Sequence, residues 1–215
     1  GSIKNSIIYD NTSGDGRSSV CIASGTSSST SLINTVIYNN NKIGLSVVDG
    51  AGVDIVNSII KNNVSSTDSV EINIGSNAIA SISYSMIPNG LNAINSDGTL
   101  TWGDGNIDVN PMFVDTSNGN YHLLASSMLI NAGHPDSTDS DGTRADIGAY
   151  PYLNTYSGPT WYVQTDGSDT DGTGASSSPF ASIQSAINFA TTDGDSVTVS
   201  EGTYVENLNF RGRNI

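Results

Sequence analysis

A short run of apolar residues flanked by asparagines recurs four times in the first part of the chain. The copies are NSIIYDN from Asn5, NTVIYNN from Asn34, NSIIKNN from Asn57 and the weaker YSMIPNG from Tyr84. Their spacings of 29, 23 and 27 residues fall in the range of one turn of a repeat protein. Further apolar runs, SVCIAS, GLSVVDG and SVEINIG, lie between the copies. Each repeat therefore holds at least two short strands and has no room for a helix.

Strands this short do not form a stable sheet by themselves, because a stable sheet needs several strands and a buried face. They become stable when each coil stacks on the next and every strand pairs in parallel with its equivalent about 4.8 Å away. The pattern therefore predicts an all-β parallel β-helix, a solenoid of stacked coils.

The four copies place apolar residues at two consecutive positions. The first position, which we expect to form one internal column, is occupied by Ile7, Val36, Ile59 and Met86. The second position is occupied by Ile8, Ile37, Ile60 and Ile87. A half-exposed strand would alternate apolar and polar residues. Two apolar positions in succession indicate that the strand bends there or that its outer face is covered.

An asparagine ends three of the copies, at Asn11, Asn40 and Asn63, and Gly90 ends the fourth. Asparagine tolerates left-handed backbone angles at a corner, and stacked amides can hydrogen-bond along the coils. These asparagines are either single turn formers or a ladder, and their shared register favours the ladder. Asn11 and Asn63 also stand in N-x-S sequons, the acceptor sequence for N-glycosylation.

Two later segments differ from the repeats. Residues 106–153 contain NPMFVD, YHLL, SMLINAG and DGTRADIGAY in this order. Residues 161–215 contain a Gly/Asp-rich loop, a Pro-Phe pair, a helical pattern and GTYVEN. The first segment resembles the closing region, and the second the opening region, of right-handed parallel β-helix proteins of bacterial surfaces and of secreted polysaccharide-active proteins, the pectate-lyase-like β-helix superfamily. The resemblance implies a right-handed coil, and enzymes of this fold include pectate lyases and polygalacturonases.

The opening segment predicts one short capping α-helix over about residues 182–192. Its apolar stripe at helical spacing is Ile183, Ala186, Ile187 and Ala190. Ser182 is suited to cap the N-terminus of this helix, and Gly194 is suited to stop it. An amphipathic helix across the end of a solenoid would cover the apolar lumen and the unpaired strand edges.

A closing region that precedes an opening region is an unusual order. We expect β-helix coils over residues 1–105, the closing region over 106–153, a linker over 154–160, and an opening cap with the first coil of a following or neighbouring β-helix over 161–215. The chain is then part of a longer protein with successive modules, a circularly permuted β-helix, or a subunit that donates its opening segment to the next copy. Such head-to-tail donation generates filaments.

Donation to another copy or continuation into a second module is favoured over closure within the chain. The linker 154–160 spans at most about 25 Å, and a return along the coils needs a comparable or larger distance. We expect the opening segment to pack on residues 1–11 of a neighbouring copy and to bury well over about 1,000 Å². The expected contact residues are Ile3, Ile7, Tyr204, Leu208, Phe210 and Ile215.

The charge of the chain limits the classes of partner that it can bind. It carries 21 acidic and 7 basic residues, a net charge of −14, which opposes binding to nucleic-acid phosphates and to anionic lipid. No apolar run reaches the roughly 20 residues of a membrane span. Few charged residues, abundant Gly, Ser, Thr and Asn and an acidic balance favour an extracellular or cell-surface protein. The single cysteine, Cys21, allows no internal disulfide.

The coils show no convincing catalytic group, so we predict no catalytic residue. A glycosidase needs two carboxylates across a cleft, but Asp10, Asp49 and Asp54 have Asn, Ser or Gly at the equivalent places of adjacent coils. A uronate lyase needs a strong base beside carboxylates that hold Ca²⁺, and no group of aspartates is expected to face Lys4 or Lys61.

Two aspartate-rich loops are candidates for Ca²⁺ binding. Both contain D-x-D-G-T, and alternate carboxylates with a sharp glycine turn can converge on one ion. Without an ion, the same residues would form hydrogen-bonded turns. The candidate ligands are Asp136, Asp139, Asp141 and Asp146 in one loop and Asp166, Asp169 and Asp171 in the other.

These observations predict an extracellular structural or adhesive β-helix module, which assembles head-to-tail with copies of itself or belongs to a tandem array of modules. The alternative is a module that binds or cleaves polysaccharide. Aromatic side chains that could stack on sugar rings stand at one equivalent position of two copies, Tyr9 and Tyr38, whereas the third copy has Lys61 there. This short aromatic strip makes the structural function the first prediction.

Overall fold

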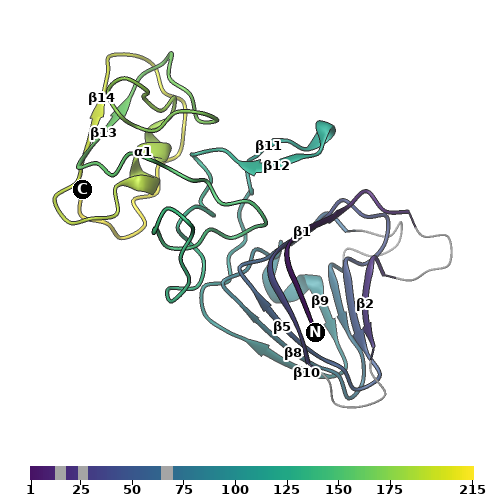
Figure 1. Ribbon diagram of the computed structural model, residues 1–215. Helices are drawn as coiled ribbons and strands as arrows, with labels where there is room; N and C mark the ends of the chain where they lie inside the picture. Colours follow the sequence, from purple (N-terminus) through teal and green to yellow (C-terminus); the bar gives the residue numbers. More distant parts are fainter. Residues whose placement is uncertain (13–17, 24–28, 64–69) are drawn as a thin grey trace. The chain divides into compact units, whose positions relative to one another are not determined.

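The computed structural model describes residues 1–12, 18–23, 29–63 and 70–215. Parallel strands from successive coils stack into a β-solenoid, which is the purple to teal part of the chain in Figure 1. A single short α-helix occurs in the described residues, close to the C-terminal strands. The predicted all-β parallel β-helix with one short α-helix is confirmed.

Two parallel sheets form the wall of the solenoid. The strands of the larger sheet are β1 (Ser2–Tyr9), β3 (Ser29–Tyr38), β5 (Gly52–Val56), β6 (Ile59–Lys61), β8 (Ile79–Ser83) and β10 (Thr99–Trp102). The strands of the smaller sheet are β2 (Val20–Ala23), β4 (Leu45–Val48), β7 (Ile72–Ile74) and β9 (Ile94–Ser96), and the 3₁₀ helix η1 (Gly90–Ala93) precedes β9. The larger sheet has the order β1-β3-β5-β8-β10, with β6 also paired to β3, and the smaller has the order β2-β4-β7-β9. Each strand therefore pairs with its equivalent in the next coil.

The four repeats are in register. In the pairing of β1 with β3, Ile7 lies opposite Val36, and in the pairing of β3 with β6, Val36 lies opposite Ile59. Parallel bridges continue this line from Ile59 to Met86 and from Met86 to Ile107. The predicted equivalence of these residues is confirmed, and Ile107 extends it by one coil.

The prediction that this first column is internal is wrong. The apolar core of the solenoid contains the second column, with Ile37, Ile60 and Ile87. Consecutive strand residues point to opposite faces, so the first column lies on the outer face, where Val36, Ile59 and Met86 are nevertheless fully buried. Gly148, with φ of 131°, passes so close that an added Cβ would lie 3.1 Å from Ile59 Cδ1. A covered outer face was one of the two explanations for paired apolar positions, and it is the correct one.

The asparagines that open the repeats form hydrogen bonds with the covering segment, residues 145–150. Asn34 donates from Nδ2 to the carbonyl oxygens of Asp146 (3.2 Å) and Gly148 (3.1 Å). The backbone N–H of Gly148 donates to the carbonyl of Asn57 at 2.9 Å, and Asn57 Oδ1 accepts from the backbone N–H of His134 at 2.7 Å. The coils and the residues that cover them are therefore joined by side-chain and backbone hydrogen bonds.

Left-handed residues form two rows of corners. Asn5, Asn34, Asn57 and Tyr84 have φ between 47° and 51°. Asp10, Asn39, Asn62 and Asn89 have φ between 52° and 61°. The predicted left-handed corner at Asn11, Asn40 and Asn63 is therefore wrong by one residue, because the preceding residue takes that conformation. Asparagine and aspartate suit these corners, since their short polar side chains tolerate an angle that is costly for other L-residues.

The residues that follow the coils form short elements of a different kind. These are β11 (Phe113–Asp115), the 3₁₀ helix η2 (Thr116–Asn118), β12 (Asn120–Leu123), β13 (Thr160–Val163), α1 (Ile183–Phe189) and β14 (Ser196–Val199). β11 and β12 are antiparallel, and β13 and β14 are parallel. Trp161 stacks on Phe180 with ring centroids 6.4 Å apart and lies 5.7 Å from the ring of Phe189. An aromatic cluster thus forms the core of this region.

The helix α1 is shorter than the predicted residues 182–192. Ser182 caps its N-terminus as predicted, because the Ser182 side chain accepts from the backbone N–H of Ser185. The helix ends at Phe189, and Gly194, which was expected to stop it, lies in a later turn with φ of 93°. Ala186 and Ile187 of the predicted apolar stripe are buried.

The chain divides into two compact units. The coil unit comprises Gly1–Val109, Ala132–Ser137 and Ala145–Tyr150, and the cap unit comprises Asn110–Asn131, Thr138–Arg144 and Pro151–Ile215. Residues of the expected closing region thus occur in both units. In the cap unit, Asn188 Nδ2 donates to the carbonyls of Ala125 and Ser127 at 2.9 Å each. Residues of the closing region thus pack against the opening segment, a contact that the sequence did not predict; packing on residues 1–11 of a neighbouring copy stays a prediction.

Candidate functional sites

A row of amides, buried at Asn40 and Asn63, runs along one corner of the coils and ends at a carboxylate. Asn11 donates from Nδ2 to Asn40 Oδ1 at 2.9 Å, and Asn40 donates from Nδ2 to Asn63 Oδ1 at 2.6 Å. Asn63 donates from both Nδ2 and its backbone N–H to Glu71 Oε2, at 2.9 Å each. The same amides also donate to the carbonyls of Ile8 and Ile37 of the preceding coil. Side chains thus replace the sheet hydrogen bonds at this corner.

Glu71, which the sequence analysis missed, is only 3% exposed. Burial raises the pKa of this carboxyl group above its ordinary value, although hydrogen bonds from Asn63 and the charge of Lys61 oppose the increase. The available signal was a carboxylate just before the alternately buried strand INI in the run SVEINIG. Asn63, one of the sequon asparagines, is fully buried, and the sequon serines Ser13 and Ser65 lie outside the described residues.

A second row of polar contacts, also missed, involves the second residue of the repeat copies. The backbone N–H of Thr35 donates to Ser58 Oγ, and that of Ser58 donates to Ser85 Oγ, each at 3.1 Å. The backbone N–H of Ser85 continues the row to Asn106 Oδ1 at 3.0 Å. The recurring NS, NT, NS and YS dipeptides were the sequence signal. This row, like the amide row, joins one coil to the next.

The two candidate sugar-stacking residues lie side by side, since Tyr9 is opposite Tyr38 in the pairing of β1 with β3. Tyr9 is 42% exposed, and Tyr38 Oη accepts from Asn62 Nδ2 at 3.1 Å. The coil unit also has a cavity of about 510 Å³, whose polar lining is Asn39, Lys61, Asn62, Glu71, Asn89 and Asp108. Amides, a lysine and two carboxylates therefore lie next to the tyrosine pair.

The first aspartate loop does not gather its four candidate ligands in one unit. Asp136 and Asp146 belong to the coil unit, whereas Asp139 and Asp141 belong to the cap unit. Asp141 accepts from the backbone N–H and the hydroxyl of Thr143 and from the backbone N–H of Asn154. Burial alone would raise the pKa of Asp141, but these hydrogen bonds outweigh it and lower the pKa. Asp141 thus forms a hydrogen-bonded turn.

The second aspartate loop positions the helix. Asp169 Oδ1 accepts from the backbone N–H groups of Ala181 and Ser182 and from Ser185 Oγ. Asp166 and Asp171 are exposed. Across the part of the chain that the structure describes, no group of three or more His, Cys, Asp or Glu side chains is arranged to hold a metal ion. Calcium binding by either loop stays a prediction.

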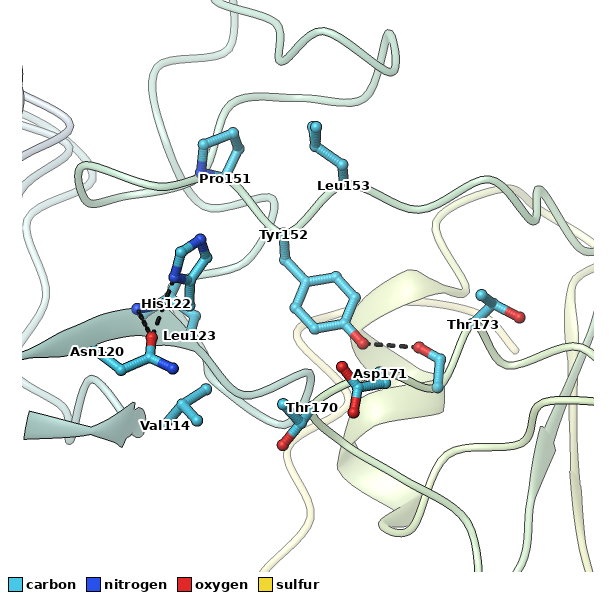
Figure 2. A pocket seen from close by; sticks show the side chains of 11 residues that line it. Val114, Asn120, His122, Leu123, Pro151, Tyr152, Leu153, Thr170, Asp171 and Thr173 are labelled. Atoms are coloured by element: carbon cyan, nitrogen blue, oxygen red, sulfur yellow. Dashed lines mark hydrogen bonds between the residues drawn. The ribbon is translucent and has the colours of Figure 1, made fainter. Parts of the chain in front are cut away.

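The cap unit contains a cavity of about 340 Å³, shown in Figure 2. Its lining includes Asn120, His122, Tyr152, Leu153, Thr170 and Asp171. Tyr152 Oη donates to the carbonyl of Gly172 at 2.7 Å, and His122 Nδ1 lies 3.1 Å from Asn120 Oδ1. The sequence analysis assigned no role to His122 or Tyr152, because the segments that meet here are distant in sequence.

The expected assembly residues lie at the two ends of the chain. Ile3 and Ile7 are partly buried on β1, which is an edge strand of the larger sheet. Tyr204 and Ile215 are also partly buried. Leu208 and Phe210 are exposed, at 41% and 52%.

Comparisons with models of protein families, with curated proteins and with solved structures found no match for this chain. Among the described residues, no helix is long and apolar enough to cross a membrane. The parallel β-helix therefore rests on the strand pairing, and the function has to be argued from the surfaces of the two units.

Proposed function

We propose that the chain is a structural module of an extracellular protein and that it stacks head-to-tail on further β-helix, either a second copy or a following module. The observation that carries this proposal is an apolar surface formed by the C-terminal segment, the residues after β14. Val205, Leu208 and Phe210 of this segment are 95%, 41% and 52% exposed. Three large apolar side chains exposed within six consecutive residues make this segment a candidate contact surface.

Other residues of the C-terminal segment are anchored within the cap unit. Glu206 accepts from the backbone N–H groups of Ile183 and Gln184, at 2.8 and 2.9 Å, at the start of α1. Arg211 donates to the carbonyl of Ile130 at 2.7 Å, and Arg213 donates to the carbonyl of Ile187. The apolar side chains are thus presented by an already ordered segment, which lowers the entropy cost of binding a partner.

The C-terminal segment and the first strand of the coil unit each offer a surface that stacking on further β-helix would bury. β14 ends at Val199, and residues 200–215 contain no strand, as expected for a coil that has no further coil stacked on it. β1 is an edge strand of the larger sheet and carries the partly buried Ile3 and Ile7. An open strand edge and an apolar coil surface are the two groups that stacking would bury.

Sedimentation velocity of the full chain over a wide concentration range tests self-stacking. We expect the average mass to rise with concentration. Val205→Ser combined with Phe210→Ser should weaken association by at least about tenfold, because each large apolar side chain contributes about 1.5–3 kcal/mol on burial. Leu91→Ser is the matched control, since Leu91 is 53% exposed on η1 and should not change association.

A protein with two copies joined end to end tests stacking on a following module. Hydrogen exchange at residues 200–215 of its first copy should slow relative to the single chain, and the double variant should abolish that protection. A single chain that is monomeric at every concentration, together with unchanged exchange in the joined protein, would overturn the proposal.

Polysaccharide binding is a second candidate function, supported by the in-register Tyr9 and Tyr38 beside the amide-rich cavity of the coil unit. Sugars stack on aromatic faces and hydrogen-bond to amides and carboxylates. Affinity electrophoresis of the chain in gels containing neutral or acidic polysaccharides tests this function. Retardation that Tyr9→Ala removes, and that Tyr204→Ala does not, supports binding at the tyrosine pair. Equal mobility in every gel contradicts it.

A further inference from the structure

The cavity of the cap unit has an apolar side and a polar side. Leu123, Leu153 and the ring of Tyr152 provide apolar surface, and His122 and Asp171 provide polar groups. In Figure 2 these side chains come from strand β12, from the segment around Tyr152 and from the loop at Asp171, and they surround one hollow. Its volume of about 340 Å³ is at the lower end of the range for small-molecule sites.

The hydrogen bonds of Asn120 determine which nitrogen of His122 carries a proton. Asn120 Oδ1 accepts from the backbone N–H of His122 at 3.2 Å, and His122 Nδ1 lies 3.1 Å from the same oxygen. An amide oxygen only accepts, so Nδ1 must be the donor in this contact. In the neutral imidazole the lone pair then lies on Nε2. Asn120 thus holds the imidazole of His122 in the lining of the cavity.

The other polar groups make the cavity negative. Asp171 has an exposed carboxylate. Burial and the negative charges of Asp169 and Asp171 raise the pKa of the Tyr152 phenol, which remains neutral and donates to Gly172. The negative potential opposes an anionic ligand and attracts a cation. The face of a tyrosine ring attracts cations as well.

We propose that this cavity binds an aliphatic ammonium group, either a free primary amine or a lysine side chain of a peptide. The charge of the ammonium lies at the Asp171 carboxylate, and its alkyl stem packs on Tyr152 and Leu123. An ammonium group offers three hydrogen-bond donors and no acceptor, which matches the accepting carboxylate of Asp171 in the cavity lining. This site is independent of the stacking surfaces and extends the protein from a structural module to one that also binds amines.

NMR titration of the full chain with n-butylamine hydrochloride, n-butanol and sodium butyrate tests the charge requirement at constant chain length. We expect saturable shifts with butylammonium at the backbone amides of His122 and Asp171, with a dissociation constant of about a millimolar. Butanol should bind at least about tenfold more weakly, because it lacks the charge-assisted hydrogen bond, and butyrate should not bind. Equal shifts with butanol and butylammonium would overturn the proposal.

Two charge-removing variants in the same loop locate the site. Asp171→Asn should weaken butylammonium binding by at least about tenfold, whereas Asp166→Asn, which removes an exposed charge that does not line the cavity, should leave it unchanged. Equal effects of the two variants would reduce the finding to nonspecific attraction by a chain of net charge −14.

A parallel titration with Nα-acetyl-lysine methylamide separates the two sources of the ammonium. Tighter binding than butylammonium assigns the cavity to a peptide lysine, and equal or weaker binding assigns it to a free amine. Saturable binding of methyl glucoside in place of both amines would show a saccharide site and overturn the proposal.

Discussion

The coil unit and the cap unit are held together in different ways. In the coil unit one kind of bond is made once in each coil, as in the steps from Asn11 to Asn40 and from Asn40 to Asn63. In the cap unit each contact is made once, as in the stacking of Trp161 on Phe180 and the hydrogen bond from the backbone N–H of Ser182, the N-cap of α1, to Asp169. In a repeat structure many equivalent contacts between adjacent coils share the stability. In the cap unit a few residues, each with its own contacts, account for most of it.

The largest expected effect concerns the aromatic cluster of the cap unit. Trp161→Ala should cost about 3–5 kcal/mol of unfolding free energy, because Trp161 is 3% exposed and its Nε1 donates to Asp195 at 3.3 Å. Hydrogen exchange in increasing urea measures this for each unit, and α1 should lose protection first. Trp102→Ala, at the partly exposed edge strand β10, is the control and should cost less. Equal loss of protection in both units would contradict the distinction between them.

The amide row is the corresponding test in the coil unit. Asn40→Ala should cost about 2–4 kcal/mol, because it removes the hydrogen bonds of a buried side chain to Asn11, to Asn63 and to the carbonyl of Ile8. Urea unfolding followed by far-UV circular dichroism measures the change. Asn95→Ala removes an exposed contact between neighbouring coils, to Asn73, and should stay within about 0.5 kcal/mol. Similar costs for the two variants would show that burial of the row is unimportant.

A smaller effect is expected at the helix cap. Asp169→Asn should destabilise α1 by about 1–2 kcal/mol, because the carboxylate accepts from two backbone N–H groups and one hydroxyl and charged acceptors bind more strongly than amides. Hydrogen exchange of residues 183–189 measures it, with Asp166→Asn as the control for lost charge. If added Ca²⁺ raises the stability of the parent chain but does not change that of Asp169→Asn, the calcium prediction for this loop is supported instead.

The smallest effect is the pH dependence that Glu71 confers on the coil unit. The pKa of Glu71 is raised in the folded chain above its value of 4.5, so the folded state holds the proton more tightly than the unfolded state. The contribution is therefore most favourable below pH 4.5 and declines as pH rises through the raised pKa. The stability of the parent chain minus that of Glu71→Gln should fall across this window in urea titrations. A difference that rises with pH would contradict the direction.

The sequence by itself predicted the parts of the molecule that repeat. Four copies of one pattern aligned Ile7 with Val36 and Ile59, and they placed Asn11, Asn40 and Asn63 at one register position, which the strand pairing and the hydrogen bonds now show. Prediction succeeds here because equivalent residues of adjacent coils contact one another, so a one-dimensional pattern is enough to specify their register.

The tertiary structure decided what no repeat encodes. The first apolar column lies outside the lumen, and it is buried there because residues 145–150 cover the outer face of the strands. The tertiary structure also paired the amide row with Glu71 and gathered His122, Tyr152 and Asp171 around one cavity. These contacts join segments that share no periodicity, and a chain's pattern does not specify which distant segments meet. Their positions follow from packing in three dimensions, which is why the candidate amine site emerged only from the folded cap unit.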